Sequence, residues 1–143
     1  MQFIVWTSEM SVDVKMLDND HKRLAILINE LHAGLMAGRA MEELERIFDE
    51  LVAYSRVHFA HEERILAETG YSGAAAHKKE HDHKTNQLLI MQARFSRAKE
   101  STDYLEVLDQ LKEWLFMHME HSDKEFMAHL KASGVESILA GWN

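Results

Sequence analysis

The sequence predicts an all-α protein: an up-down-up-down antiparallel four-helix bundle, preceded by an N-terminal arm and followed by a short C-terminal tail. Three observations support this prediction. The 143 residues include no proline, the residue that most often breaks a helix. Apolar side chains recur at steps of three and four residues in four stretches, and no stretch alternates as a half-buried strand does. The breaks between the stretches are short, which favours antiparallel neighbours.

Each of the four stretches has one apolar face, the pattern of a helix that packs on one side. The helices are expected over about residues 18–37, 41–69, 74–98 and 102–132, within a single domain that takes in residues 1–143. The inward residues of the first two helices are Leu24, Leu27, Ile28, Leu31 and Leu35, then Leu44, Phe48 and Leu51. Those of the last two are Leu88, Met91 and Phe95, then Leu108, Leu111 and Leu115.

Small and polar residues mark the ends of the helices. Gly70 and Gly73 form the turn between the second and third helices, because glycine tolerates the backbone angles that a tight turn needs. Ser101 or Thr102 is expected to cap the start of the fourth helix. Asp18 is expected to cap the start of the first helix rather than to bind a ligand.

Composition excludes several classes of protein. Asp and Glu outnumber Lys and Arg by 24 to 16 and no basic run occurs, which argues against a nucleic-acid partner. No apolar stretch approaches the ~20 residues of a membrane span. The short apolar run Phe3–Trp6 has no basic leader, so the cytoplasm is the expected location. The absence of cysteine excludes disulfides, thiolate zinc sites and cysteine-bound iron–sulfur clusters.

Histidine is abundant, with ten residues, and half of the histidines fall on inward phases of the expected helices. Two carboxylates join them. The pairs in the second and third helices are four residues apart, which places both members on one helix face. The set is His21 in the first helix, His58 and Glu62 in the second, His77 and His81 in the third, and His118 and Asp123 in the fourth.

A metal cluster explains why these polar groups point into the core. A buried carboxylate without a partner is very costly, and buried polar groups must be satisfied. Neutral imidazoles and carboxylates are metal ligands, and a carboxylate can bridge two ions. Seven ligands are too many for one ion that also admits a small molecule, so they favour two. Ligation by nitrogen and oxygen without thiolate fits iron, and on ligand type alone copper or zinc as well.

The choice of Asp123 does not follow from helix geometry. His118 and Asp123 are five residues apart, about 140° around an ideal α-helix. They can flank a site but do not point the same way, so spacing alone would select Ser122 or His121 instead.

The ordered ligand pattern resembles the hemerythrin family, specifically its single-domain bacterial members. The resemblance runs from Trp6 to about Leu130 and favours Asp123 as the last ligand. It implies a non-haem di-iron centre, with a solvent-derived bridging oxygen, that binds O2 reversibly. By this resemblance one iron is held by three histidines and the other by two, with two carboxylates bridging. These are His77, His81 and His118 for the first iron, His21 and His58 for the second, and Glu62 and Asp123 as bridges.

The resemblance also implies an apolar O2 pocket that slows water entry. Its candidate lining residues are Leu24, Phe59, Trp114, Leu115 and Met119. Two residues depart from the family pattern: Met119, where a β-branched residue is common, and Asp20, where glutamine is frequent. Neither is expected to touch the ligands. The other histidines are expected to be surface or supporting groups: His32, His61, His83, His121 and His129.

The expected function is therefore reversible O2 binding for storage, delivery or buffering rather than catalysis, with an O2-consuming enzyme as a candidate recipient. The alternatives are a sensor of oxygen, redox state or nitric oxide, a di-iron peroxidase, and a protein that repairs iron centres. Ferritin-like oxidases use Glu-x-x-His on two helices. This chain has that spacing once, in Glu80 and His83. Sensors are usually fused to signalling domains and repair proteins often carry an N-terminal cysteine segment, and neither is expected in this chain.

Overall fold

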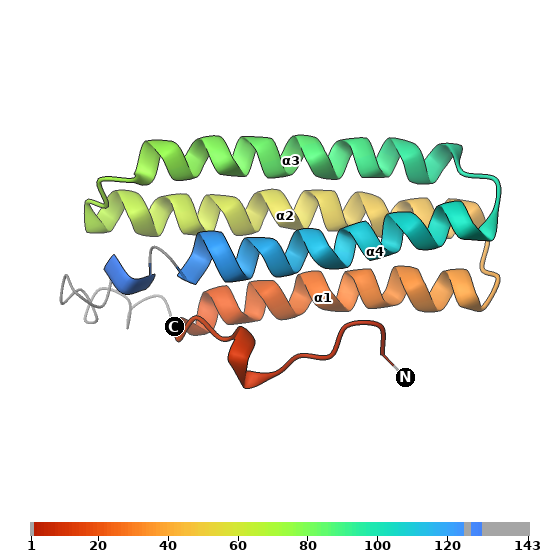
Figure 1. Ribbon diagram of the computed structural model, residues 1–143, viewed down its shortest axis with the longest axis horizontal. Coiled ribbons are helices and arrows are strands. Elements are labelled where there is room, and N and C mark those ends of the chain that lie inside the picture. The colour runs from red at the N-terminus through yellow and green to blue at the C-terminus, as the bar shows by residue number, and fades with distance from the viewer. Residues whose placement is uncertain (1, 125–126, 130–143) are drawn as a thin grey trace.

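The structure is a computed structural model that describes residues 2–124 and 127–129, with only the backbone for residues 121–123. Four long helices lie side by side along one axis (Figure 1). They are α1 (Lys15–Met36), α2 (Met41–Thr69), α3 (Ala74–Arg97) and α4 (Ser101–Met117). Consecutive helices run in opposite directions and contact each other, and α1 also contacts α4, which closes the bundle. The predicted antiparallel four-helix bundle is confirmed.

The turn between α2 and α3 forms as the glycines indicate. Gly70 ends α2 with a φ of 67°, in the left-handed region that glycine adopts without strain. The Tyr71 N–H then bonds back to the Leu66 carbonyl at 3.1 Å. The expected cap of α4, Ser101 or Thr102, is wrong. Glu100 is the extended residue before the helix, and Ser101 is already the first helical residue.

The expected cap of α1 is wrong. The helix begins at Lys15 after the extended residue Val14, so Asp18 lies within the first turn. Its carboxylate instead accepts hydrogen bonds from the Ser11 hydroxyl, at 2.6 Å, and from the Val12 N–H, at 2.9 Å. Asp18 therefore binds the arm to the start of α1, a contact with residues six and seven positions earlier.

The N-terminal arm packs along α1 and includes one short 3₁₀ helix, η1 (Ser8–Met10) (Figure 1). Ile4 is buried, and its backbone is paired on both sides with Asn29. The Ile4 N–H donates to Asn29 Oδ1 at 2.7 Å, and Asn29 Nδ2 donates to the Ile4 carbonyl at 2.9 Å. The arm is thus an ordered part of the packing against α1.

The buried apolar residues form two clusters along the bundle. The larger cluster contains the predicted inward stripes, with Leu24, Phe48, Leu88 and Leu111 among its members. The smaller one is the end cluster, which consists of Val12, Val14, Leu17, Ile65, Leu66 and Met127. Leu17 lies one helical turn before His21, and Ile65 lies one turn after Glu62. A layer of buried polar residues therefore lies between the two apolar clusters.

The last helix changes its pitch where that polar layer begins. After α4 the backbone forms a π-helix, η2 (His118–Asp123), and Lys124 and residues 127–129 are again helical. Residues 130–132, which complete the fourth helix expected from the sequence, fall outside the described part of the chain. Among the described residues, no helix has the length and apolar character needed to cross a membrane.

Candidate metal centre

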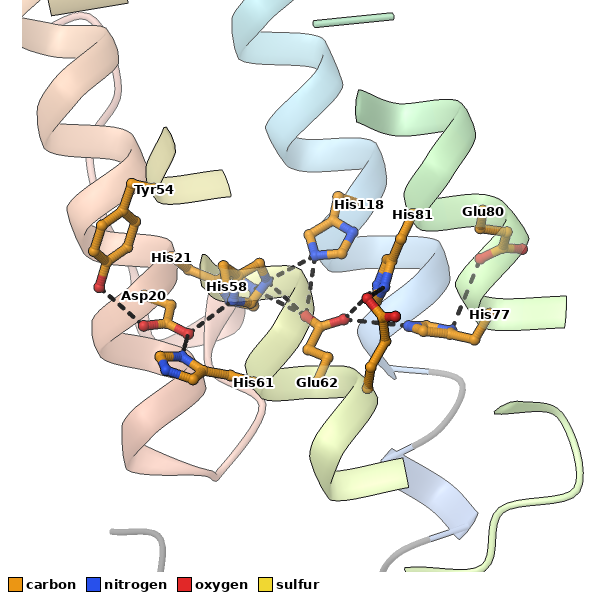
Figure 2. A network of polar contacts seen from close by, with 11 residues as sticks. Asp20, His21, Tyr54, His58, His61, Glu62, His77, Glu80, His81 and His118 are labelled. Carbon is orange, nitrogen blue, oxygen red and sulfur yellow. Dashed lines mark hydrogen bonds and ion pairs between the residues drawn. The ribbon is translucent and has the colours of Figure 1, made fainter. Parts of the chain in front are cut away.

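Six of the seven residues that the sequence singles out as ligands come together at one end of the bundle (Figure 2). Because consecutive helices run in opposite directions, the starts of α1 and α3 lie at the same end of the bundle as the ends of α2 and α4. All six side chains are buried. They are His21 from α1, His58 and Glu62 from α2, His77 and His81 from α3, and His118 at the end of α4.

Three histidines face one oxygen of the Glu62 carboxylate. The distance from Glu62 Oε1 is 2.6 Å to His58 Nε2 and 3.1 Å to His118 Nε2. His21 Nε2 is 3.8 Å from the same oxygen. The three ring nitrogens also lie close together, with His58 Nε2 at 3.1 Å from His21 Nε2 and 2.9 Å from His118 Nε2. This is the first group of potential ligands.

The other two histidines face the second oxygen of Glu62. His81 Nε2 lies 2.9 Å from Glu62 Oε2, and His77 Nε2 lies 3.2 Å from it. These three residues form a second group whose ligand atoms lie within 4.8 Å of one another. Glu62 belongs to both groups and presents one carboxylate oxygen to each of them (Figure 2).

The spacing of these atoms fits bound metal ions. Ligand atoms about 2.0–2.2 Å from one ion lie about 3 Å from their neighbours in its coordination sphere. Most of the separations within each group, from 2.6 to 3.2 Å, are of this size. Imidazole nitrogens and a carboxylate, without thiolate, also suit iron, copper and zinc. The residues therefore fit a metal centre in both geometry and donor chemistry.

Glu62 is charged although it is fully buried. Burial alone would raise the pKa of this carboxyl, but the charges of His58 and His118, together with hydrogen bonds from His118 and His21, hold it well below its usual value. An ionised carboxylate in an apolar core is tolerated only with such partners. Glu62 thus contributes a negative charge that a bound cation would neutralise.

The position of His118 differs from what the family resemblance implies. The resemblance assigns His118 to the same ion as His77 and His81, whereas its Nε2 lies beside His58 and Glu62 Oε1. The His118 ring centroid is 5.0 Å from that of His58 and 5.9 Å from that of His81. His118 therefore lies between the two groups, closer to the first.

The seventh expected ligand, Asp123, has a side chain outside the described residues, but its backbone is informative. Asp123 is the last residue of the π-helix that begins at His118. In a π-helix the hydrogen bonds join residues five apart, so a residue and the fifth one after it are stacked along the axis. The wide angle that an α-helix would place between positions 118 and 123 does not apply to this backbone.

One residue that supports the centre was missed from the sequence. Asp20 was expected not to touch the ligands, and this expectation is wrong. Its Oδ2 accepts hydrogen bonds from His58 Nδ1, at 2.9 Å, and from His61 Nδ1, at 2.8 Å, while Oδ1 accepts one from the Tyr54 hydroxyl at 2.9 Å (Figure 2). His58, His61 and Tyr54 are all on α2, and the sequence contains no pattern that pairs them with α1.

His81 also has a carboxylate behind it. Its Nδ1 donates to Glu63 Oε2 at 3.2 Å, and Glu63 is paired with Lys78 at 3.3 Å. His77 Nδ1 lies 3.9 Å from Glu80 Oε2, which is too long for a hydrogen bond. Glu63 directly follows Glu62, so a pair of adjacent acidic residues was the only signal for it in the sequence.

The residues expected to line an O2 pocket are all buried in the larger apolar cluster: Leu24, Phe59, Trp114, Leu115 and Met119. Phe59 is the one with ring contacts to the ligands. It stacks on His81 with 4.3 Å between ring centroids and meets His118 edge-on at 5.2 Å. Phe59 and His81 also border a surface cleft of about 350 Å³ between α2 and α3.

The remaining histidines whose side chains the structure describes are not members of the two ligand groups. His32 stacks on Phe3 of the arm, with 4.5 Å between ring centroids, and His83 borders a surface groove between α3 and α4. His129 packs against Tyr71.

His61 differs from these histidines, because its Nδ1 donates to Asp20, which also accepts a hydrogen bond from the ligand candidate His58. The side chain of His121 lies outside the described residues.

Comparisons with known proteins agree with this site. Residues 12–130 match the family model of the hemerythrin HHE cation binding domain. The bacteriohemerythrins of Stenotrophomonas maltophilia (strain R551-3) and Pseudomonas aeruginosa (strain LESB58) are each 30% identical to this chain. The first match covers 99% of this chain and 94% of that protein, and the second covers 96% and 88%.

The fold agrees with solved hemerythrin structures as well. The crystal structure of a wild-type hemerythrin superposes with a TM-score of 0.73 at 28% identity, over 88% of this chain and 96% of that one. The family model spans all four long helices, including the whole of α1 with His21, and takes in residues 12–14 of the arm. With the buried His and Glu cluster in place at one end of the bundle, the chain belongs to the hemerythrin family.

Proposed function

We propose that this protein binds O2 reversibly at a non-haem di-iron centre, for oxygen storage, delivery or buffering. The observation that carries the proposal is the division of five imidazoles between the two oxygens of one buried carboxylate, Glu62. One ion with six ligand positions cannot take this set and also leave room for O2. Two ions that share Glu62 can.

Within this proposal each residue has a role. Glu62 would hold one ion through Oε1 and the other through Oε2. His21 and His58 belong to the first ion, and His77 and His81 to the second. Asp123 is proposed as the second bridge, and His118 as a further ligand at the junction between the groups. Two ferrous ions held by these residues would supply the two electrons that reversible O2 binding at such a centre needs.

The apolar surroundings favour binding over release of reactive products. Phe59 packs against His81 and His118, and Trp114 packs against Phe59, so these buried rings exclude water from that side. A dry wall would slow proton delivery and so slow irreversible oxidation of the centre. The nitrogen-rich ligand set also differs from the carboxylate-rich Glu-x-x-His sites of ferritin-like oxidases. These features support binding rather than catalysis as the role.

The test is anaerobic reconstitution of the purified protein with ferrous iron, followed by addition and removal of O2. We expect two irons per chain and absorption bands in the near-ultraviolet and visible range that appear with O2 and disappear on deoxygenation. One metal ion per chain, or a spectrum that does not respond to O2, would contradict the proposal. Steady consumption of O2 with a reductant would show an oxidase instead.

A pair of histidine variants makes the test specific. His118→Ala removes an imidazole from the cluster and is expected to lose iron. His32→Ala removes a histidine that stacks on the arm, away from the ligands, and is expected to keep both irons. Equal iron content in the two variants would contradict the ligand assignment.

A further inference from the structure

Asp20 is the most deeply buried carboxylate of the described residues apart from Glu62, and it lies behind the ligands rather than among them. It is 2% exposed, and three side chains of α2 donate hydrogen bonds to it. The donors are the Tyr54 hydroxyl and the Nδ1 atoms of His58 and His61 (Figure 2). Both carboxylate oxygens are therefore occupied, and the charge remains unneutralised by any lysine or arginine in those contacts.

The contact with His58 determines what that ring can offer to a metal. A carboxylate only accepts hydrogen bonds, so the proton between Asp20 and His58 belongs to Nδ1 of the ring. In the neutral imidazole the other nitrogen, Nε2, then carries the lone pair, and it is aimed at Glu62 Oε1 at 2.6 Å. Two acceptors then face each other, and a bound cation takes the place that a proton occupies between them when the His58 ring is charged.

The carboxylates behind the two histidines of the second group, His77 and His81, are more exposed than Asp20. Behind His81 stands Glu63, which is 30% exposed, lies 3.2 Å from Nδ1 and shares its charge with Lys78. Behind His77 stands Glu80, which is 53% exposed and 3.9 Å away. Water screens charges at such positions much more than at a buried one. The two ligand groups therefore differ in the negative charge placed behind their imidazoles.

We propose that Asp20 is a positioning residue that makes the His21–His58 half of the centre the stronger metal site. It fixes His58 with Nε2 toward the metal and, through its buried charge, makes that imidazole the more basic ligand. The inference rests on the proposed metal centre but names a difference between its two halves. Tyr54 and His61 hold Asp20 in place, and His61, which is 33% exposed, links this network to the surface.

Zinc binding tests the inference without O2. The metal-free protein is titrated with Zn(II) against a chelator, which resolves two binding steps. We expect Asp20→Asn, which removes the charge but keeps the size, to weaken one step by about 10–100-fold. Glu63→Gln should weaken binding by less. Asp49→Asn is the matched control, because that exposed carboxylate contacts Gln92 on the outside of the bundle and should bind as the wild type does.

A spectroscopic readout separates positioning from general stability. In the Zn(II)-loaded wild type, the His58 Nδ1 proton should resonate far downfield and exchange slowly, as expected for a bond to a buried carboxylate. It should move upfield in Asp20→Asn and stay in place in Asp49→Asn. Unchanged Zn(II) affinity in Asp20→Asn, or an equal loss in Glu63→Gln, would overturn the inference.

Two further variants keep the test decisive if Asp20→Asn does not fold. Tyr54→Phe and His61→Ala each remove one donor to Asp20 and leave all proposed ligands in place. Each should weaken the same Zn(II) step and move the same proton resonance, and unchanged values in both would reject the role of Asp20. Failure of the O2 test with normal Zn(II) results would reject the proposed function alone.

Discussion

Phe59 lies flat against the imidazole of His81, with 4.3 Å between the ring centroids and 16° between the ring planes. The two residues come from different helices, α2 and α3. Phe59 directly follows His58 and is itself 3% exposed, so it is both part of the apolar core and a wall of the candidate centre. The packing of the bundle and the orientation of a ligand ring are therefore coupled at this contact.

Replacing Phe59 should separate the two consequences of that coupling. Phe59→Leu removes ring contacts from the core and is expected to destabilise the metal-free protein by about 1–3 kcal/mol, measured by denaturant unfolding. Because His81 loses its stacking partner, metal affinity should fall as well. Phe48→Leu is the matched control, since Phe48 is also buried but packs at a tilt against Phe95, away from the ligands. It should lose stability and keep metal affinity, so equal affinities in the two variants would contradict the coupling.

The π-helix predicts which residue of its last turn binds metal. The step of five residues from His118 places position 123 one turn along the axis. We expect Asp123→Ala to lower the iron content, measured by elemental analysis after anaerobic reconstitution. His121→Ala and Ser122→Ala should retain two irons per chain. If either of these loses iron while Asp123→Ala keeps it, the assignment of the last ligand is wrong.

In the folded protein the Tyr54 hydroxyl should ionise at a higher pH than that of an ordinary tyrosine. Burial and the hydrogen bond to Asp20 raise its pKa to about 12, from the value of about 10 in an unfolded chain. Because the folded pKa is the higher one, this contact stabilises the protein fully below about pH 10 and is lost as the pH rises toward 12. The difference in near-ultraviolet absorbance between wild type and Tyr54→Phe, followed against pH, gives the midpoint. A midpoint near pH 10 would contradict the prediction.

Metal should stabilise the whole bundle, because the proposed ligands come from all four helices. An ion that binds only the folded chain adds about 2.7 kcal/mol per site when its free concentration is 100 times the Kd. The melting temperature should therefore rise with added Fe(II) under anaerobic conditions. Mg²⁺ is the control, since it prefers oxygen ligands and water and should leave the melting temperature unchanged. Equal effects of the two ions would indicate nonspecific binding.

The sequence was sufficient for the fold and for most of the cluster, for one physical reason. Helical periodicity determines which side chains face inward, and His58, Glu62, His77 and His81 share the phase of the buried leucines. Contacts between helices are not encoded in that period. The hydrogen bond from His58 to Asp20 depends on how α1 and α2 are packed, so it became visible only in the structure.

The two other differences are also physical. The relative placement of His118 and Asp123 could not be derived from an ideal α-helix, because the backbone there is a π-helix with more residues per turn. The prediction of Asp18 as a cap was wrong because α1 begins about one turn earlier, at Lys15. The Asp18 carboxylate instead accepts hydrogen bonds from two residues of the arm. In both cases the rule for an ideal, isolated helix failed: at Asp18 because the arm packs there, and at His118 because the backbone departs from the α-helix.

The end cluster, which lies on the outer side of the polar layer, affects how readily amide hydrogens and bound cations can exchange with solvent. It is much smaller than the cluster on the inner side, and Val12 and Val14 in it come from the arm. Regions with few buried apolar contacts open locally at a lower free energy than the whole protein unfolds. Amide hydrogens around Leu17 and Ile65 should therefore exchange before those around Phe48. The protein can then admit or lose a cation by a transient opening of one end while the rest of the bundle remains folded.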